Sequence, residues 1–302
     1  MSVYDLLQKE NYMIGVSSRE REFLIEKHGG LWRYLDKGYP ITMVVRNVEK
    51  DSYQRALSDK YPTINLVTAN DISSLPDKRK ILLQEAHQRG VEYLFMIDDD
   101  VALYFRDESL SSKYTSRAED FDKMDAFDRI LYESICLCDE IYPMVGLPLK
   151  QGSFNLKYTF PKNLPIIRFM CFHVPTLIKE NVEMTGLGTI NMSDRYVQLS
   201  LLEKGYATIS NCRWCVGDPG TGYRGGCEKT RTVDTHNESA QALTRRFPKA
   251  VTLKWKENGL WSERRLDCSI DWKYYLKEDE PRFVNVEAGL DKLRKHREGY
   301  DV

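Results

Sequence analysis

Short apolar runs alternate with helix-like stretches through the first part of the chain. The runs at residues 12–16, 41–45, 64–67 and 93–97 are bounded by polar breaks, which is typical of strands buried on both faces. Between them, residues 19–27, 50–57 and 77–88 have the composition of helices, and Gly90 is placed to end the last one. Strands that alternate with helices predict an α/β protein with a doubly wound, mainly parallel sheet flanked by helices.

The pattern changes in character after residue 215. Before that point it predicts a loop or lid at residues 106–120, helices at 121–140 and 193–206, and strands at 144–147, 166–172 and 207–210. After it come a glycine-rich loop at 218–226, a short helix at 237–247 and a strand at 251–255 that pairs with residues 266–272. We therefore divide the chain into a main domain at 11–215 and a small C-terminal extension at 216–302, a lid region packed on the same domain.

Composition narrows the class of protein. The chain has 302 residues, of which 42% are hydrophobic, so it can bury a large core. It has no apolar run of membrane-spanning length and no signal-peptide pattern, and its seven cysteines predict reduced thiols. We expect a cytoplasmic protein without a membrane partner, whose oligomeric state the sequence leaves open. Charge is uneven, because residues 224–265 carry 10 Lys and Arg against 5 Asp and Glu, which favours a polyanionic partner.

Three consecutive aspartates, Asp98, Asp99 and Asp100, directly follow the apolar run at 93–97. In open α/β sheets, ligands bind at the carboxyl ends of the strands. Adjacent carboxylates repel one another, so a cation is the obvious neutraliser, and hard oxygen ligands suit Mg²⁺ or Mn²⁺ that arrives with substrate phosphates. Asp98 and Asp100 point the same way in an extended segment and are the expected ligands. The alternative is an acidic turn after a core strand.

Other candidate residues have ordinary structural alternatives. Asp194 suits a general base, but its place at the start of a helix also suits a capping acid, which spacing alone favours. His236 suits a metal ligand or a surface histidine. The cysteines Cys212, Cys215 and Cys227, with His236 or His173, suggest a zinc site, although the CxxC has no second pair.

The C-terminal third is rich in aromatic and basic residues. Its aromatic residues suit either core packing or base stacking, with interleaved Lys and Arg for phosphate contacts; they are Trp214, Trp255, Trp261, Trp272, Tyr274 and Tyr275. Arg245 and Arg246 are the expected contacts to nucleic acid.

As a set, the motifs of residues 12–210 resemble nucleotide-sugar-dependent glycosyltransferases of the GT-A fold, which has a Rossmann-like sheet. The resemblance is carried by Ser17-Ser18-Arg19, Arg79-Lys80 and Ile97-Asp98-Asp99-Asp100. Ser193-Asp194 looks like the Glu-Asp segment of family 2 inverting enzymes. Ser193 departs from that pattern, which leaves Asp194 alone to carry the role of catalytic base.

The C-terminal part has a narrower likeness, to phage TET-associated DNA glycosyltransferases. These are similar to the arabinosyltransferases of T-even-like phages that modify 5-hydroxymethylcytosine. The matching segments are Gly225-Gly226-Cys227, Arg231-Thr232, residues 236–240, Phe247-Pro248 and Asp271-Trp272-Lys273.

The resemblance implies a metal-dependent, inverting enzyme. It would move a sugar, arabinose or glucose, from a UDP-sugar to the hydroxymethyl group of 5-hydroxymethylcytosine in double-stranded phage DNA, in the host cytoplasm. By that likeness Asp98, Asp100 and His236 hold Mn²⁺ or Mg²⁺ and Asp194 is the base. The nucleotide-sugar site comprises Ser17, Arg19, Arg79, Lys80, Asp98, Asp99, Arg224 and Arg231. The same transfer to a glycan or other acceptor is one alternative, and a non-catalytic nucleotide-binding module is another.

Overall fold

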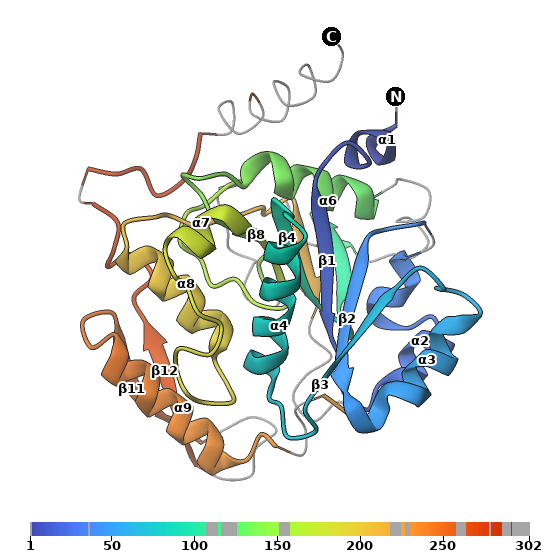
Figure 1. Cartoon of the computed structure of the whole chain (residues 1–302). Helices are drawn as coiled ribbons and strands as arrows, with labels where there is room; N and C mark the ends of the chain where they lie inside the picture. The colour runs from blue at the N-terminus through green and yellow to red at the C-terminus, as the bar shows by residue number, and fades with distance from the viewer. Residues whose placement is uncertain are drawn as a thin grey trace.

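The computed structural model describes residues 2–35, 37–106, 114–115, 126–150, 158–217, 225–226, 230–257, 264–277, 279–285 and 291. A seven-stranded sheet runs through the middle of this part of the chain (Figure 1). In spatial order its strands are β3 (Asn65–Ala69), β2 (Ile41–Arg46), β1 (Tyr12–Ser17), β4 (Tyr93–Asp98), β8 (Phe169–His173), β7 (Met144–Gly146) and β9 (Ile209–Ser210). Only β8 runs against its neighbours in this sheet, so the mainly parallel α/β fold that the sequence predicts is confirmed.

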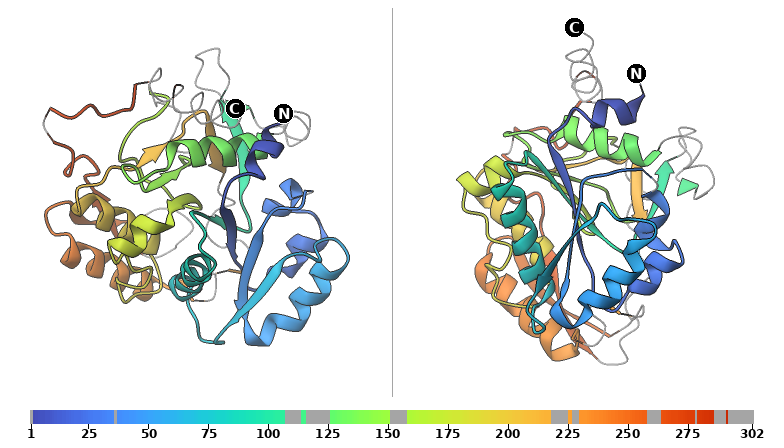
Figure 2. Two further views of the ribbon diagram at one scale, coloured as in Figure 1. Left: turned by 45° about the horizontal axis from the view of Figure 1, so that its top comes forward. Right: turned by 45° about the vertical axis from the view of Figure 1, so that its right-hand side comes forward.

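Helices cover both faces of the sheet (Figure 2). Side chains alternate along a strand, so Ile14 and Phe95 enter one apolar cluster while Met13 and Leu94 enter another. The first cluster is covered by α1 (Val3–Leu7), α2 (Glu22–Glu26), α3 (Lys50–Ser58) and α6 (Ala126–Leu137), and the second by α4 (Leu75–Gln88), α7 (Val174–Lys179) and α8 (Ser193–Glu203). This two-sided burial explains why β1 and β4 are almost wholly apolar.

Two smaller sheets and one further helix complete the described fold. β10 (Trp214–Gly217), β5 (Ala102–Arg106) and β6 (Tyr114–Thr115) form an antiparallel sheet, and β11 (Val251–Lys256) pairs with β12 (Arg265–Ile270). α9 (Val233–Arg246) packs on that pair, and a third apolar cluster joins Leu243 and Phe247 to Leu199 and Leu202 of α8. The described C-terminal segment is thus anchored on α8. No helix in the described part of the chain is long and apolar enough to cross a membrane.

Helix boundaries differ from the sequence prediction at two places that matter for the site. α2 begins at Glu22 instead of residue 19, because the Ser18 hydroxyl is engaged by Asp99 and Tyr53 and does not cap a helix. α9 begins at Val233 instead of 237, because Thr232 and Thr235 form a capping box. His236 therefore lies inside a helix. Most of the predicted lid at 106–120 and of the glycine-rich loop at 218–226 lies outside the described residues.

A short 3₁₀ helix, η1 (Gly30–Tyr34), packs directly on the backbone of the aspartate segment. The Leu31 N–H donates to the Asp99 carbonyl oxygen over 3.1 Å. Gly30 has φ +57°, and a Cβ added there would lie 2.2 Å from the same carbonyl oxygen. Gly30 is therefore needed both for its backbone conformation and for the close approach to Asp99.

We expect Gly30→Ala to destabilise the protein more than Gly90→Ala. Gly90 also has a positive φ (+65°), but a Cβ there meets no atom within 4 Å. The Gly90 change should thus cost about 1 kcal/mol, from backbone strain alone, and the Gly30 change more, because the Asp99 backbone must move. Urea unfolding of the two variants measures the difference, and equal losses would contradict the packing argument.

Candidate functional site

Three arginines surround the three aspartates at the end of β4. Arg21 Nη1 lies 2.6 Å from Asp99 Oδ1 and 2.9 Å from Asp100 Oδ2. Arg168 Nη1 lies 2.9 Å from Asp100 Oδ1 and 3.6 Å from Asp98 Oδ2. Arg79 Nη2 lies 3.3 Å from Asp98 Oδ1.

In the described residues, arginine side chains supply the positive charge that the sequence predicts next to these aspartates. Each aspartate already has a guanidinium partner from another part of the chain. The side chains of Asp99 and Asp100 are only 2% and 3% exposed, whereas that of Asp98 is 25% exposed. Asp98 is thus the carboxylate most open to a ligand, and metal binding by Asp98 and Asp100 stays a prediction.

Burial shapes the protonation of the network. It raises the pKa of Asp100 to about 6, with help from the neighbouring carboxylates and against the pull of Arg168 and Arg21. Burial likewise raises the pKa of Asp99, against Arg21 and the Ser18 hydrogen bond. The pKa of Arg21 is also raised, since the attraction of Asp99 and Asp100 outweighs the effect of its own burial. The network is held together by ion pairs whose carboxylates have little access to water.

Three non-glycine residues with left-handed backbone conformations lie around the network. They are Glu20 (φ 55°), Arg168 (φ 66°) and Met192 (φ 64°). Glu20 immediately precedes Arg21, Arg168 is a partner of two aspartates, and Met192 immediately precedes Ser193-Asp194. Such conformations cost about 1–3 kcal/mol each and cluster at functional sites.

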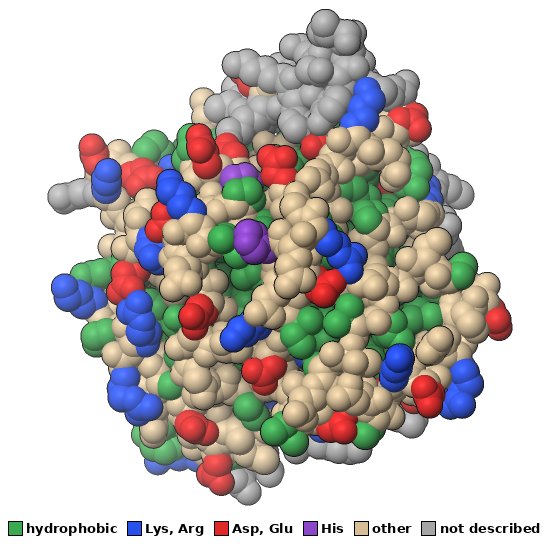
Figure 3. Space-filling model, viewed as in Figure 1, with side chains coloured by type: hydrophobic (Ala, Val, Ile, Leu, Met, Phe, Trp, Pro, Cys, Tyr) green, Lys and Arg blue, Asp and Glu red, His purple; other side chains and the backbone are tan. Residues whose placement is uncertain are grey.

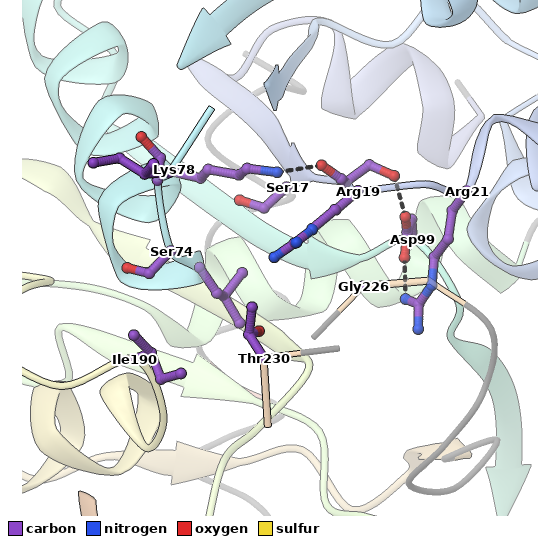
Figure 4. Close-up of a pocket in the computed structure, with 13 residues that line it drawn as sticks. Ser17, Arg19, Arg21, Ser74, Lys78, Asp99, Ile190, Gly226 and Thr230 are labelled. Atoms are coloured by element: carbon purple, nitrogen blue, oxygen red, sulfur yellow. Dashed lines mark hydrogen bonds and ion pairs between the residues drawn. The ribbon is translucent and has the colours of Figure 1, made fainter. Parts of the chain in front are cut away.

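A pocket of about 560 Å³, including its open mouth, lies beside Asp99 (Figure 4). The end of β1 and the following loop contribute Ser17, Ser18, Arg19 and Arg21. The loop before α4 and the start of that helix contribute Ile72, Ser73, Ser74, Leu75 and Lys78. Ile190, Gly226 and Thr230 form the facing side. Of the residues expected to bind the nucleotide-sugar, the structure places Ser17, Arg19 and Asp99 on the pocket wall.

The α4 cation in this pocket is Lys78, which the sequence prediction missed. Lys78 is only 3% exposed, and its Nζ donates to the Ser18 carbonyl oxygen. Lys80, which was expected there, is exposed and does not line the pocket. Helical spacing is the signal that could have found this, because Lys78 and Arg79 lie four residues before the buried Leu82 and Leu83, whereas Lys80 lies four residues before the exposed Gln84.

Two glycines of the glycine-rich segment contact the loop after β1. The Gly226 N–H donates to the Arg19 carbonyl oxygen over 2.7 Å. A Cβ at Gly225 (φ +82°) would lie 2.6 Å from the Glu20 carbonyl oxygen. The segment thus approaches the pocket through backbone that has no room for side chains. Its neighbours Arg224 and Cys227 lie outside the described residues.

One arginine connects the aspartates to the predicted catalytic segment. Arg79 Nη1 donates to Ser193 Oγ over 3.0 Å, while its Nη2 donates to Asp98 Oδ1 over 3.3 Å. Asp194 follows at the start of α8, partly exposed, with Oδ1 accepting from the Arg195 N–H. The structure therefore brings Asp98, Arg79 and Ser193 together and places Asp194 one residue further on. The serine at 193 accepts the Arg79 hydrogen bond without adding a fourth carboxylate to the network.

His236 does not join the aspartates in this arrangement. Its Nε2 lies 3.9 Å from Asp267 Oδ1. Burial lowers its pKa, as do the charges of Arg265, Arg195 and Arg231, against the pull of Asp267. Among the described residues, no group of three or more His, Cys, Asp and Glu side chains is placed to hold a metal ion. The predicted set of Asp98, Asp100 and His236 is therefore not assembled here.

The same finding bears on the zinc hypothesis. Cys212 and Cys215 are buried, and His173 Nδ1 lies 2.7 Å from the Thr176 hydroxyl. Neither cysteine belongs to a metal-holding group in the part of the chain that the structure describes. The buried cysteines are thus accounted for as core residues.

The remaining predicted residues fall at two ends of α9. Arg231 precedes the helix and donates from Nε to Asn191 Oδ1 over 3.3 Å, beside the pocket residue Thr230. Arg245 and Arg246 are in its last turn, where Arg246 forms two hydrogen bonds with Glu203 at 2.6 and 3.1 Å. Arg245 is exposed.

Comparison with known proteins points to the glycosyltransferase class. No protein-family model matches the chain. It is 23% identical to the β-glucosyl-HMC-α-glucosyl-transferase of Enterobacteria phage T2 over 245 residues, which cover 76% of this chain and 79% of that protein. The predicted resemblance to glycosyltransferases, including phage enzymes of DNA modification, is supported by this similarity.

Solved structures also match the chain, at low sequence identity. A mannosyltransferase from Pyrobaculum calidifontis, in complex with GDP-Man and Mn²⁺, matches with a TM-score of 0.43 and 12% identity, covering 82% of this chain and 69% of that one. S. aureus TarS, in complex with UDP, matches with a TM-score of 0.40 and 11% identity, covering 78% and 65%.

The raised pKa of Asp100 predicts how stability changes with pH. Its pKa is 3.8 for a free aspartate and about 6 in the fold, so between these values the folded state binds more protons than the unfolded state. The free energy of unfolding should therefore fall as pH rises from about 4 to about 6, and Asp100→Asn should make that fall shallower. Urea unfolding in EDTA at a series of pH values measures both slopes.

Asp59→Asn, at an exposed position at the end of α3, controls for the loss of one surface carboxylate. If wild type and Asp100→Asn show the same pH profile, burial of the Asp100 carboxylate does not contribute to the pH dependence.

Proposed function

We propose that this protein is a glycosyltransferase that transfers a sugar from a UDP-sugar to 5-hydroxymethylcytosine in double-stranded phage DNA. The observation that carries the proposal is the link through Arg79, which binds Asp98 beside the donor pocket and Ser193 beside Asp194. A donor pocket and a candidate base thereby meet at one edge of the sheet, which is the geometry that group transfer requires. The similarity to the phage T2 enzyme supports both the reaction and the kind of acceptor.

The pocket is chemically suited to the nucleotide half of the donor. Lys78 and Arg19 supply positive charge for the diphosphate, and the hydroxyls of Ser17 and Ser73 supply hydrogen bonds for diphosphate and ribose. Arg21 is committed to Asp99 and Asp100. The nucleotide-sugar therefore binds against Lys78 and Arg19, with its sugar directed toward Asp98.

The carboxylates at the end of β4 fit a divalent cation in part. Carboxylate oxygens suit Mg²⁺ or Mn²⁺, and Asp98 is the most exposed of the three. A cation held by Asp98 and Asp100 would take oxygens that now pair with Arg79 and Arg168. Its chemical contribution when bound is to neutralise the departing diphosphate.

In the proposed reaction Asp194 takes the proton of the acceptor hydroxyl. The hydroxyl oxygen attacks the anomeric carbon of the sugar, the bond to the diphosphate oxygen breaks, and UDP leaves with inversion at that carbon. Arabinose and glucose both remain donor candidates. The name of the phage T2 relative also favours a second acceptor, a hydroxymethylcytosine that already carries glucose. Phage DNA as acceptor would place the reaction in the host cytoplasm.

Asp194→Asn should lose at least about 100-fold in transfer while it keeps its affinity for UDP, because the amide cannot accept the acceptor proton. Transfer is measured by mass spectrometry of hydroxymethylcytosine DNA and of its glucosylated form, incubated with UDP-arabinose or UDP-glucose and Mn²⁺. UDP affinity is measured by calorimetry.

Asp234→Asn is the matched control for this experiment, since Asp234 is an exposed first-turn acid of α9. Near-normal transfer by Asp194→Asn would refute its role as base. Transfer to neither DNA with either donor would refute the proposed reaction as stated.

Metal dependence gives a separate prediction. Excess EDTA should abolish transfer and Mn²⁺ should restore it, and Asp98→Asn should raise the Mn²⁺ concentration needed for half-maximal transfer, because the most exposed carboxylate is lost. The readout is initial rate against Mn²⁺ concentration at fixed UDP-sugar. Full activity in EDTA would show that the arginines and Lys78 suffice without a cation.

A further inference from the structure

A second charged cluster, distinct from the aspartate network, lies where α8 and α9 begin. Its centre is Asp267 of β12, which is 7% exposed. Asp267 Oδ1 lies 3.5 Å from Arg195 Nη1 of α8, and its Oδ2 lies 2.6 Å from Lys256 Nζ of β11. Arg195 and Lys256 therefore share a single carboxylate.

A third cation, Arg231, belongs to the same cluster. Arg231 lies just before α9, and in the first turns of that helix the ring of His236 faces Asp267. The hydrogen-bond partner of Arg231 is the neutral amide of Asn191. We call Arg195, Arg231 and Lys256 the basic cluster, and their three positive charges outnumber the single negative charge of Asp267.

The basic cluster is continuous with the wall of the donor pocket. Ile190 and Thr230 line that pocket, and the next residue of each segment, Asn191 and Arg231, are hydrogen-bonded to one another. Further along the first segment, Ser193 contacts Arg79 and Arg195 contacts Asp267. Residues 190–195 thus run from the donor pocket, past Asp194, to the basic cluster.

The side chains of the cluster are open to solvent as well as charged. Those of Arg195 and Lys256 are 31% and 50% exposed. Both helices present their first turns here, where backbone N–H groups add positive potential. In Figure 1 the first turns of α8 and α9 face the middle of the molecule and their last turns lie at its left edge.

At the C-terminal ends of α8 and α9, in contrast, a basic side chain is balanced by an acidic one. There Arg246 is paired with Glu203, and ten residues of helix, about 15 Å, separate it from His236. Figure 3 shows Lys and Arg side chains interspersed with acidic ones along this edge of the molecule. A polyanion that reaches Asp194 would meet the basic cluster before it meets Arg245 and Arg246.

We propose that the basic cluster binds backbone phosphates of the duplex next to the nucleotide that receives the sugar. This inference rests on the proposed function, since it takes DNA as the acceptor. Arg195 and Lys256 are placed to exchange one shared carboxylate for phosphate oxygens, which are strong acceptors for both side chains. The cluster positions the duplex so that the hydroxymethyl group reaches Asp194.

The test measures binding of a labelled hydroxymethylcytosine duplex by fluorescence anisotropy over a range of salt concentrations. Arg195→Gln and Lys256→Gln should each weaken binding several-fold at moderate salt, irrespective of the flanking sequence. Each should also reduce the slope of log affinity against log salt by about 1, and the double variant by about 2. UDP affinity is measured on the same samples and should stay close to wild type, and melting curves of each variant establish that it is folded at the assay temperature.

Two further variants sharpen the result. Arg55→Gln removes an exposed arginine from α3, on the other side of the molecule, and should leave the slope unchanged. Arg231→Gln separates two roles, since a phosphate contact predicts weaker DNA binding with normal UDP affinity, and loss of UDP affinity alone would remove Arg231 from the cluster.

The outcomes distinguish the two proposals. One outcome is that wild type binds the duplex and that Arg195→Gln and Lys256→Gln lower its affinity no more than Arg55→Gln does. In that case the phosphate-binding role of the basic cluster is refuted, and the proposed reaction stands. If wild type does not bind the duplex even at low salt, DNA as acceptor fails and this inference fails with it.

Discussion

The presence of three adjacent carboxylates, two of them buried, is the constraint on which the rest of the site depends. Asp99 and Asp100 are almost closed to water, and an isolated buried carboxylate is costly. The fold offsets that cost with Arg21, Arg79 and Arg168, which come from the loop after β1, from α4 and from the residue before β8. Each ion pair therefore also fixes one element relative to the end of β4.

The two-sided sheet is what allows these elements to converge. β1 and β4 are parallel neighbours with Ser17 opposite Asp98, so the loops that follow them leave the sheet at the same edge. α4 on one face brings Lys78 and Arg79 to that edge, and η1 supports the Asp99 backbone from the cluster on the other face. Residues that are far apart in sequence thereby form one pocket.

Arg79 connects the aspartates at the end of β4 to the second part of the site, the start of α8. Through one guanidinium, the position of Asp98 is coupled to the start of α8, and α8 in turn carries Asp194 and Arg195 toward α9 and β12. In the proposed reaction this coupling aligns the sugar donor with the acceptor hydroxyl. In the same proposal, Lys78 and Arg19 supply positive charge to the donor and the basic cluster supplies it to the acceptor.

Local pattern was sufficient for the sheet and for the place of the site. The apolar runs marked β1, β2 and β4, because strands buried on both faces must be apolar throughout, and Asp98 to Asp100 marked the edge where ligands bind. The sequence also singled out Ser17, Arg19 and Asp99, which line the pocket. The partners of the site residues were determined by the tertiary structure alone. Arg21 and Arg168 neutralise the aspartates, Lys78 replaces Lys80, and His236 lies against Asp267, because each pairing joins side chains that are distant in sequence and meet only when sheet and helices pack.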